Sequence, residues 1–382
     1  MKILFVSSDN NKTSGAFLCL VELVVCLKKI YDIEAVVIIP KPGDGIELLK
    51  AHNIRYKYVR SFSWITYNGY SFRAIMKTIF KISAIPINIL AVYKICKIIR
   101  EENIDIVHTN TIFSYVGALA AKLEKAKHIW HIRECINESY HSKILFDGMG
   151  YGLIDKSDRI LAVSGMVKEH YQYLLKKSID VVYDGVSDKF VKSREIFKSQ
   201  CIEITCIGSL SKNKNQIDLL RAAVNLKQCG YNNFHINIVG RGSAEKELKD
   251  YVHNNELNNF VKFWGNIDNV NSVLDITDVL CTMAQSEAFG RTVVEGILHN
   301  CLVVGAVSKD NALKEIIDNG VTGYTFPFGN INELSRLLQS CMNEKKQSKL
   351  RIIATKGKQK AEKKFLVYHS VSTIYKFYER LM

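Results

Sequence analysis

The chain has 382 residues, of which 47% are hydrophobic and 24% are charged. This length is too great for one ordinary hydrophobic core and favours two domains of a soluble globular protein. The formal net charge of +14 indicates an anionic partner, but charge alone does not distinguish nucleic acid, an acidic membrane surface and a charged substrate. The ten cysteines are scattered without a Cys-x-x-Cys pair, and the first residues carry no secretory signal. We therefore expect reduced thiols in a cytoplasmic protein.

The first half of the chain alternates apolar strands with helical segments. Lys2–Ser7 is predicted to be a strand and Ala16–Ile30 a helix capped by Ser14, which is how nucleotide-binding α/β domains begin. Five further strands are predicted at Glu34–Pro40, Ile54–Val59, Asp105–Thr109, Lys127–Ile132 and Arg159–Val163. This alternation predicts a parallel, doubly wound sheet with ligands at the carboxyl ends of its strands. His108 and His131 lie at such ends, and we expect His108 to be structural, as a lone histidine more often is.

The composition changes between Ser61 and Arg100. Apolar residues follow helical spacing at Phe72, Ile75, Met76 and Ile79. Basic residues line an adjoining face at Arg73, Lys77 and Lys81, and aromatic residues precede both sets at Trp64, Tyr67 and Tyr70. A basic amphipathic helix of this kind fits docking on an anionic bilayer. The alternative is a core-packed helix with an ordinary solvated face. The longest apolar run, Ile82–Tyr93, is shorter than the roughly 20 residues of a spanning helix, so we expect no transmembrane segment.

A second alternating series follows a polar segment. Asp180–Val186 reads as a last strand that enters a hinge, and Val186–Gln200 is polar and without periodicity, as a linker is. The predicted strands and helices beyond it are Ile202–Gly208, Gln216–Cys229, Phe234–Gly240, Ala244–His253, Val261–Trp264, Asp278–Ala284 and Leu302–Ala306, with a terminal helix at Tyr368–Leu381. We therefore divide the chain into residues 1–185, residues 186–365 and a terminal helical segment, residues 366–382.

Two glutamates flank the start of one predicted helix. Gly290 permits a tight turn and Thr292–His299 reads as a helix, so Glu287 lies in the loop and Glu295 one turn inside the helix. The positive end of a helix attracts phosphate, and a carboxylate beside it can accept hydrogen bonds from vicinal hydroxyls of a ribose or a sugar. The alternative is an exposed helix with solvated charges.

The segment Met283–Glu295 resembles the signature of the retaining, group-one glycosyltransferases of family four. Four further matches occur in the family's order: Ile207–Gln216, Ile238–Gly242, Phe263–Asn266 and Glu315–Gly323. The match is continuous through the C-terminal half and thinner in the N-terminal half. The resemblance implies the GT-B fold, in which two Rossmann-like domains face each other across a cleft and the terminal helix crosses back to the N-terminal domain.

The resemblance also assigns roles around the leaving diphosphate. In the family an arginine and a lysine five residues apart stabilise its charge. Lys214 matches the lysine, whereas Ser209 replaces the arginine. The missing charge is then supplied by another cation or the enzyme is slower; we consider Arg291 first, then Arg241 or Lys212. The alternative for Lys214 is a solvated loop lysine.

The remaining site residues follow from the same resemblance. Glu295 matches the ribose-binding glutamate, Glu287 the one that contacts and orients the donor sugar, and His131 the histidine that faces the transferred sugar. The further donor-binding positions are Gly15, Gly240, Gly242, Asn266, Phe289, Gly290, Arg291 and Thr292. Gly15 equally reads as the residue that opens its helix, and a lone Gly-x-Gly is weak evidence.

Three charged residues near the end of the first domain have less certain roles: Arg133 and Glu134, which follow His131, and Asp184. Arg133 and Glu134 either meet the acceptor or form a surface ion pair. Asp184 stands before Gly185 where the family usually has asparagine.

These observations predict a retaining, metal-independent hexosyltransferase without a cofactor. It moves a sugar from a nucleotide diphosphate sugar to a growing, lipid-linked glycan in bacterial cell-surface polysaccharide synthesis. We expect it in the cytoplasm, peripheral on the inner face of the membrane. One alternative is a nucleotide-sugar epimerase of the same architecture. Another is a non-enzymatic nucleic-acid-binding protein that uses basic segments such as Lys345–Lys364, although no aromatic stacking platform lies between these charges.

Overall fold

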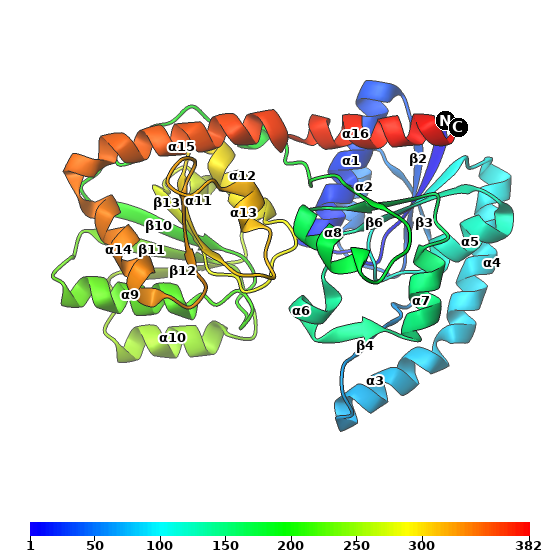
Figure 1. Cartoon of the computed structure of the whole chain (residues 1–382), viewed down its shortest axis with the longest axis horizontal. Helices are drawn as coiled ribbons and strands as arrows, with labels where there is room; N and C mark the ends of the chain where they lie inside the picture. The colour runs from blue at the N-terminus through cyan, green and yellow to red at the C-terminus, as the bar shows by residue number, and fades with distance from the viewer. The chain divides into compact units, whose positions relative to one another are not determined.

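The computed structural model describes residues 1–382. It divides into two compact units (Figure 1): unit 1 comprises Met1–Gly185 with Val367–Met382, and unit 2 comprises Val186–Leu366. Each unit is an α/β domain built on a parallel sheet, so the predicted fold class of two Rossmann-like domains is confirmed.

Unit 1 contains a seven-stranded sheet with the order β3-β2-β1-β5-β6-β8-β9. Its strands are β1 (Lys2–Val6), β2 (Glu34–Ile39), β3 (Arg55–Tyr58), β5 (Ile106–Thr109), β6 (Lys127–Ile132), β8 (Arg159–Ala162) and β9 (Ile179–Val181). Every pairing in the sheet is parallel. The carboxyl ends of all seven strands therefore lie at the same edge, where the polar residues after β1, β5 and β6 meet.

Helices cover both faces of this sheet. They are α1 (Gly15–Tyr31), α2 (Ile46–Ala51), α3 (Phe72–Ser83), α4 (Ile85–Glu102), α5 (Val116–Glu124), α6 (Ile136–Tyr140), α7 (Asp147–Ile154), α8 (Gly165–Gln172) and α16 (Val367–Leu381). Successive side chains of a strand point to opposite faces. Accordingly Ile3 and Phe5 of β1 pack in a core with α1 and α16, whereas Leu4 and Val6 pack in a second core with α4 and α5.

A small antiparallel ribbon stands outside the main sheet of unit 1. It pairs β4 (Ile65–Tyr67) with β7 (Ser142–Ile144), and α3 packs beside it. The predicted amphipathic helix thus exists as α3, but it is not core-packed, because Ala74 is its one buried residue. No single helix is long and apolar enough to cross a membrane. The pair α3 and α4 passes that test only together, with a bend of 42° between the two helices.

Unit 2 contains a six-stranded sheet with the order β12-β11-β10-β13-β14-β15. The strands are β10 (Ile202–Ile207), β11 (Phe234–Val239), β12 (Val261–Gly265), β13 (Val279–Thr282), β14 (Leu302–Val307) and β15 (Tyr324–Pro327). All pairings are parallel, and β10 and β13 are neighbours at the centre. The loops that follow these two strands therefore emerge side by side.

The helices of unit 2 enclose this sheet. They are η1 (Asp188–Phe190), α9 (Ile217–Gln228), α10 (Glu245–Asn254), α11 (Asn271–Leu274), α12 (Arg291–Leu298), α13 (Leu313–Ile316), α14 (Ile331–Met342) and α15 (Glu344–Lys364). In Figure 1 the strands of this unit lie between α12 with α15 on one side and α9 with α10 on the other.

The segment predicted as a linker, Val186–Gln200, differs from that expectation. Ile196 and Phe197 are buried in the core of unit 2, and Arg351 of α15 donates hydrogen bonds to both of their carbonyls. The segment lacks periodicity because it packs as irregular backbone, and most of it belongs to the folded unit.

Candidate functional site

The loop between β13 and α12 carries the two glutamates of the sequence signature. Gly290 immediately precedes α12 with a φ of 105°, a conformation that residues with a Cβ rarely adopt. The turn places Glu287 in the loop and Glu295 in the first turns of the helix. The first N–H groups of a helix have no intrahelical acceptor, so this end of α12 can receive an anion.

Lys214 and Glu287 form an ion pair across the neighbouring loops of β10 and β13. Asn213 joins the same loops: its side chain donates to the carbonyl of Ser286 at 2.9 Å and accepts from the Ser286 N–H at 3.0 Å. The backbone N–H of Glu287 is held in turn by the carbonyl of Asp310 at 3.1 Å. A cation and a carboxylate 73 residues apart are thus held together at one edge of the sheet.

Glu295 is also paired with a cation. Nε of Arg291 donates to its carboxylate at 2.9 Å, and the two side chains are 12% and 8% exposed. The Arg291 guanidinium, our first substitute for the arginine missing at Ser209, is therefore engaged with Glu295. Arg241 and Lys212, the other two substitutes, are exposed.

The glycines after β11 approach other parts of unit 2 itself. A Cβ at Gly240 would lie 2.0 Å from the carbonyl oxygen of Gly208, and one at Gly242 would lie 2.2 Å from that of Leu210. The close approach for which these positions require glycine is therefore to the loop after β10, which carries Lys214. Both glycines therefore allow the loop after β11 to pack against the loop that carries Lys214.

The other donor-binding candidates of unit 2 surround the same edge. Ser209 is exposed, and its carbonyl accepts from Gln216 at 2.9 Å. Asn266 follows the end of β12 and is exposed. Thr292 lies in the first turn of α12. Phe289 is buried and contacts the Phe365 ring at 5.6 Å, so it can offer a ligand its backbone but not its ring.

His131 is placed at the end of β6 in unit 1, where it is 1% exposed. Its Nδ1 lies 3.3 Å from Nε2 of His108 and 3.3 Å from Nη2 of Arg133. Nδ1 of His108 contacts the Tyr378 hydroxyl at 2.6 Å. Burial is the main cause that lowers the pKa of both imidazoles.

Arg133 forms a buried ion pair with Asp184 rather than a surface one. The two side chains are 4% and 13% exposed. The Arg133 guanidinium also donates to the carbonyl and side-chain oxygens of Asn110 at 3.0 and 3.1 Å. Asp184, which stands where the family usually has asparagine, is thus the counter-charge of this arginine.

Glu134, unlike Arg133, has a backbone N–H group as its hydrogen-bond partner. Its carboxylate accepts from the Ile112 N–H at 3.2 Å. Surrounding protein atoms raise its pKa to about 8, although the side chain keeps some exposure to solvent. A carboxyl group with this pKa exchanges its proton near neutral pH, as an acid or base in catalysis must.

Gly15 opens α1, and its surroundings leave room for a ligand. No atom lies within 4 Å of a Cβ placed there. The preceding Ser14 caps the helix by accepting from the Phe17 N–H, and its hydroxyl donates to Asp9 at 2.8 Å. The helix-opening role is therefore observed, and space for the backbone contact with a donor remains.

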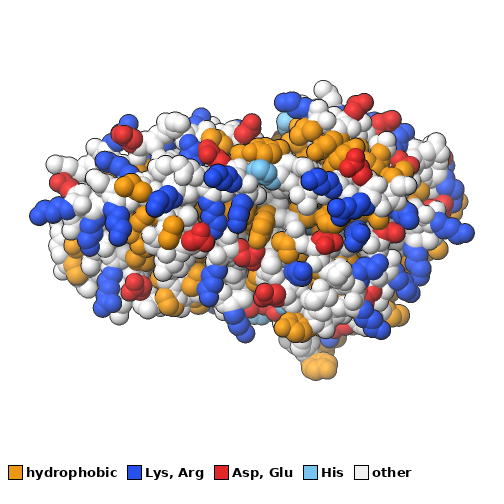
Figure 2. Space-filling view, turned by 45° about the horizontal axis from the view of Figure 1, so that its top comes forward, with side chains coloured by type: hydrophobic (Ala, Val, Ile, Leu, Met, Phe, Trp, Pro, Cys, Tyr) orange, Lys and Arg blue, Asp and Glu red, His pale blue; other side chains and the backbone are white.

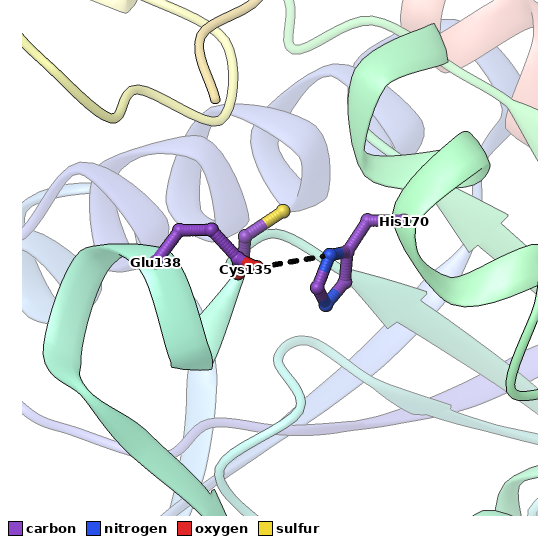
Figure 3. A group of neighbouring side chains, drawn as sticks. All are labelled: Cys135, Glu138 and His170. Atoms are coloured by element: carbon purple, nitrogen blue, oxygen red, sulfur yellow. Dashed lines mark ion pairs between the residues drawn. The ribbon is translucent and has the colours of Figure 1, made fainter. Parts of the chain in front are cut away.

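Two groups of side chains have the composition of metal ligands. Cys135, Glu138 and His170 lie together in unit 1 (Figure 3), and Cys201, Glu203 and His235 lie together in unit 2. In the first group Glu138 forms an ion pair with His170 at 3.3 Å, and the sulfur of Cys135 contacts that of Met166 at 3.6 Å. Neither group includes a residue of the Lys214 and Glu287 loops.

Two residues of these networks were not identified from the sequence. Asn213 lies between Lys212 and Lys214, and its side-chain amide could have been suspected of joining the adjacent loops. Tyr378 is 270 residues from His108, and no local pattern signals that contact.

Comparison with known proteins shows the family of the chain. The family model of group 1 glycosyl transferases matches residues 188–360, and that of glycosyltransferase family 4 matches residues 15–190. An uncharacterised glycosyltransferase of Methanocaldococcus jannaschii is 26% identical over 298 residues, which are 76% of this chain and 79% of that protein. The capsular polysaccharide biosynthesis glycosyltransferase CapH of Staphylococcus aureus is 23% identical over 235 residues, 58% of this chain and 64% of that protein.

A solved structure has the same fold over the whole chain. HepE of Anabaena, crystallised with UDP and glucose, superposes with a TM-score of 0.78 at 20% identity and covers 99% of both chains. Two consecutive family models, the relatives and this GT-B architecture agree: the chain belongs to the group 1 glycosyltransferases of family 4.

Proposed function

We propose that this glycosyltransferase moves a hexosyl group from a nucleoside diphosphate sugar to a growing glycan, with retention at the anomeric carbon and without a metal ion. The observation that carries the proposal is the Lys214–Glu287 ion pair beside the start of α12, where Glu295 is also held. HepE was crystallised with UDP and glucose, which supports a UDP-sugar as the first donor to test.

The residues of unit 2 fit the charge changes of this reaction. As the bond from the anomeric carbon to the diphosphate breaks, negative charge grows on the leaving oxygens. Lys214 and the N–H groups at the start of α12 stabilise that charge more in the transition state than in the ground state. Glu287 keeps the ammonium of Lys214 oriented before the donor binds and then orients the sugar. Glu295 accepts hydrogen bonds from the ribose hydroxyls.

Retention follows if the acceptor attacks from the face that the diphosphate leaves. The acceptor hydroxyl forms the new glycosidic bond, and its proton passes to an oxygen of the departing diphosphate. Arg241 and Lys212, both exposed, are the cations that replace the arginine missing at Ser209. No protein nucleophile takes part, so Glu287 orients the sugar rather than forming a covalent bond to it.

The proposal is tested with purified protein, a panel of UDP-, GDP- and ADP-sugars, and the variants Glu295→Ala and Lys214→Ala. One donor should raise the melting temperature, because a ligand that binds only the folded state stabilises it, by about 2.7 kcal/mol at a hundred times its Kd. Slow cleavage of that donor should continue in EDTA. Lys227→Ala, which removes a surface ion pair with Glu256, is the matched control.

Three outcomes would contradict parts of the proposal. Unchanged donor cleavage in both site variants would falsify the site assignment. Loss of cleavage in EDTA would contradict metal independence. Conversion of the donor into another nucleotide sugar without an acceptor would favour the epimerase instead.

The acceptor is proposed to be a lipid-linked glycan met at an anionic membrane surface. Seven large apolar side chains of α3 and α4 are between 47% and 79% exposed: Phe72, Ile75, Met76, Ile79, Phe80, Ile89 and Leu90. Arg73, Lys77 and Lys81 lie on α3 among them. In Figure 2 hydrophobic side chains protrude at the lower tip, where Figure 1 shows the start of α3. An apolar face with interspersed cations fits the interface of an anionic bilayer.

Vesicle flotation tests this docking surface. The protein should float with phosphatidylglycerol vesicles and much less with phosphatidylcholine vesicles, and Ile79→Asp should reduce flotation. Ile352→Asp is the matched control, since Ile352 is 57% and Ile79 54% exposed and Ile352 lies on α15 of unit 2. Equal flotation of the two variants would refute the docking surface, but it would not contradict the proposal on donor cleavage.

The name of CapH supports a bacterial capsule or related surface polysaccharide as the product, made on the cytoplasmic side of the membrane.

A further inference from the structure

Cys201, Glu203 and His235 lie together at the amino end of the sheet of unit 2. Cys201 immediately precedes β10, Glu203 is the second residue of β10, and His235 is the second residue of β11. Glu203 and His235 are partners in the parallel register of these strands, and Cys201, two residues before Glu203, points to the same face. The loops of Lys214 and Glu287 follow the carboxyl ends of β10 and β13, so this cluster lies at the opposite edge of the sheet.

The three side chains bring their metal-binding atoms close together. Sγ of Cys201 lies 3.5 Å from Nδ1 of His235, which in turn lies 3.0 Å from Oε1 of Glu203. All three atoms lie within 4.8 Å of one another. With zinc bonds of about 2.0–2.3 Å, the ligand atoms of a tetrahedral site are about 3.3–3.6 Å apart. The side chains are therefore already near the separation that a shared zinc ion requires.

The chemistry of these ligands selects among metal ions. A thiolate, an imidazole and a carboxylate are the three ligand types that zinc binds in proteins. Mg²⁺ and Ca²⁺ bind oxygen atoms and would gain a single carboxylate here. His235 is exposed, and Cys201 and Glu203 are half-buried. An ion can therefore enter from solvent and keep a water molecule as its fourth ligand.

A second layer of hydrogen bonds orients the carboxylate of Glu203. The side-chain amide of Asn237 donates to Oε2 of Glu203 at 2.8 Å, while Oε1 faces His235. The indole N–H of Trp264 donates to the side-chain oxygen of Asn237 at 2.8 Å. Hydrogen-bond partners of this kind commonly orient the ligands of a metal ion. Here they hold Glu203 through side chains of β11 and β12.

The cluster is a negatively charged place in a chain whose formal net charge is +14. The side-chain partners of Glu203 are His235 and Asn237 rather than a lysine or an arginine. Burial, followed by the charges of Glu203 and Asp278, raises the pKa of the Cys201 thiol. The same negative potential attracts a cation, and a divalent ion bonded to the sulfur would balance both carboxylates.

We propose that Cys201, Glu203 and His235 bind one Zn²⁺ ion at the amino edge of the sheet of unit 2, with water as the fourth ligand. The sulfur forms a bond to zinc, and the thiol proton passes to solvent without any oxidation or reduction. The ion joins the segment before β10 to β11. It takes no part in sugar transfer, so the site does not depend on the proposed function.

Zinc binding is measured by isothermal titration calorimetry on the full chain, after bound metal has been removed with EDTA. The wild type should bind Zn²⁺, and Cys201→Ser should lose this binding because the sulfur bond is removed. Mg²⁺ should give no binding signal in either protein. Equal binding of Zn²⁺ by the wild type and Cys201→Ser would refute the site.

Co²⁺ identifies the sulfur ligand, because a bond between cobalt and a thiolate absorbs in the near ultraviolet. This band should be absent in Cys201→Ser and present in Cys229→Ser, the matched control at an exposed cysteine of the same unit. A second control is Cys135→Ser, which changes the similar group of unit 1 (Figure 3). A band that survives in Cys201→Ser and is lost in Cys135→Ser would overturn the proposal.

Asn237→Ala tests the second layer. It should weaken Zn²⁺ binding about 10–100-fold, whereas the cobalt band at saturation should keep its intensity because the sulfur still binds. Asn255→Ala is the matched control, since the Asn255 amide donates at 2.8 Å to the carbonyl of Tyr251 in α10. An unchanged affinity for Zn²⁺ in Asn237→Ala would refute the role of Asn237.

The site and the proposed function fail separately. Cys201→Ser should cleave the donor at the wild-type rate, because the cluster and the Lys214 and Glu287 loops lie at opposite edges of the sheet. Slower cleavage in this variant, with its fold intact, would contradict the statement that the ion takes no part in transfer. If no nucleotide sugar binds at all, the proposed function fails, and the measurements with Zn²⁺ and Co²⁺ still decide the metal site.

Discussion

Replacing Asp184 by asparagine should destabilise unit 1 although the change is nearly isosteric. Asp184 balances the Arg133 guanidinium where the two side chains are 13% and 4% exposed. Removing one partner of a buried ion pair costs about 3–5 kcal/mol. The asparagine oxygen can still accept a neutral hydrogen bond worth about 1 kcal/mol. We therefore expect Asp184→Asn to lower the free energy of unfolding by about 2–4 kcal/mol.

The assay must report on unit 1 alone. Trp64 and Trp130 are buried in unit 1, whereas Trp264 belongs to unit 2. In a Trp264→Phe background, tryptophan fluorescence during urea unfolding then follows unit 1. The midpoint should fall for Asp184→Asn, while the slope with urea should stay the same if only stability has changed.

Asp180→Asn is the matched control for this measurement. Asp180 pairs with Arg159 at 3.9 Å, and these side chains are 37% and 39% exposed. An exposed pair contributes at most about 1 kcal/mol, so this variant should unfold close to the wild type. If Asp184→Asn lost no more stability than the control, the charge of Arg133 would not depend on Asp184, and our account of the buried pair would be wrong.

Two further predictions concern backbone geometry and pH. Gly240 has a φ of 130°, and its Cβ would meet the Gly208 carbonyl at 2.0 Å; Gly240→Ala should cost unit 2 about 3 kcal/mol or more in urea unfolding. Gly230→Ala shares a positive φ but has open space and should cost about 1 kcal/mol; similar losses would contradict the clash. Burial raises the pKa of Glu134 from 4.5 to about 8, so between these values the folded state holds the extra proton and stability falls as pH rises. Glu134→Gln should therefore raise the melting temperature at pH values above this window. At the lower end of the window the same substitution should raise the melting temperature little. The control is Glu102, whose pKa is lowered by hydrogen bonds from lysine and arginine, so that Glu102→Gln should lower the melting temperature at neutral pH. A higher melting temperature for Glu102→Gln, or an effect of Glu134→Gln that does not change with pH, would contradict the stated directions of the two pKa shifts.

The sequence was sufficient for most strands of the two sheets and for several of the helices that cover them. The predicted strand Lys127–Ile132 coincides with β6, and the predicted helix Thr292–His299 differs from α12 by one residue at each end. These segments have clear apolar patterns and local start signals. β15 was missed because its four residues, Tyr324–Pro327, are mostly half-buried or exposed and end in proline, so no alternating or continuous apolar pattern marks it.

The candidate site was predictable residue by residue but not contact by contact. Lys214 and Glu287 were chosen for separate roles, and their ion pair depends on β10 and β13 being neighbours, which is a property of strand order rather than of either loop. The buried character of the Arg133–Asp184 pair likewise depends on the packing of distant segments around it. The exposed apolar face of α3 left two interpretations open in the sequence, because helical spacing is the same for a buried and an unburied face.

The position of α16 has a consequence for the order in which the chain can fold as it is synthesised. Val371, Ile374 and Tyr378 are part of the core that Phe5 and α1 share in unit 1, yet they are made after the whole of unit 2. Unit 2 is continuous, Val186–Leu366, and can complete its core on the ribosome first. Unit 1 must wait with one face of its sheet incomplete, so the nascent chain exposes the apolar surface of α1 until synthesis has passed unit 2.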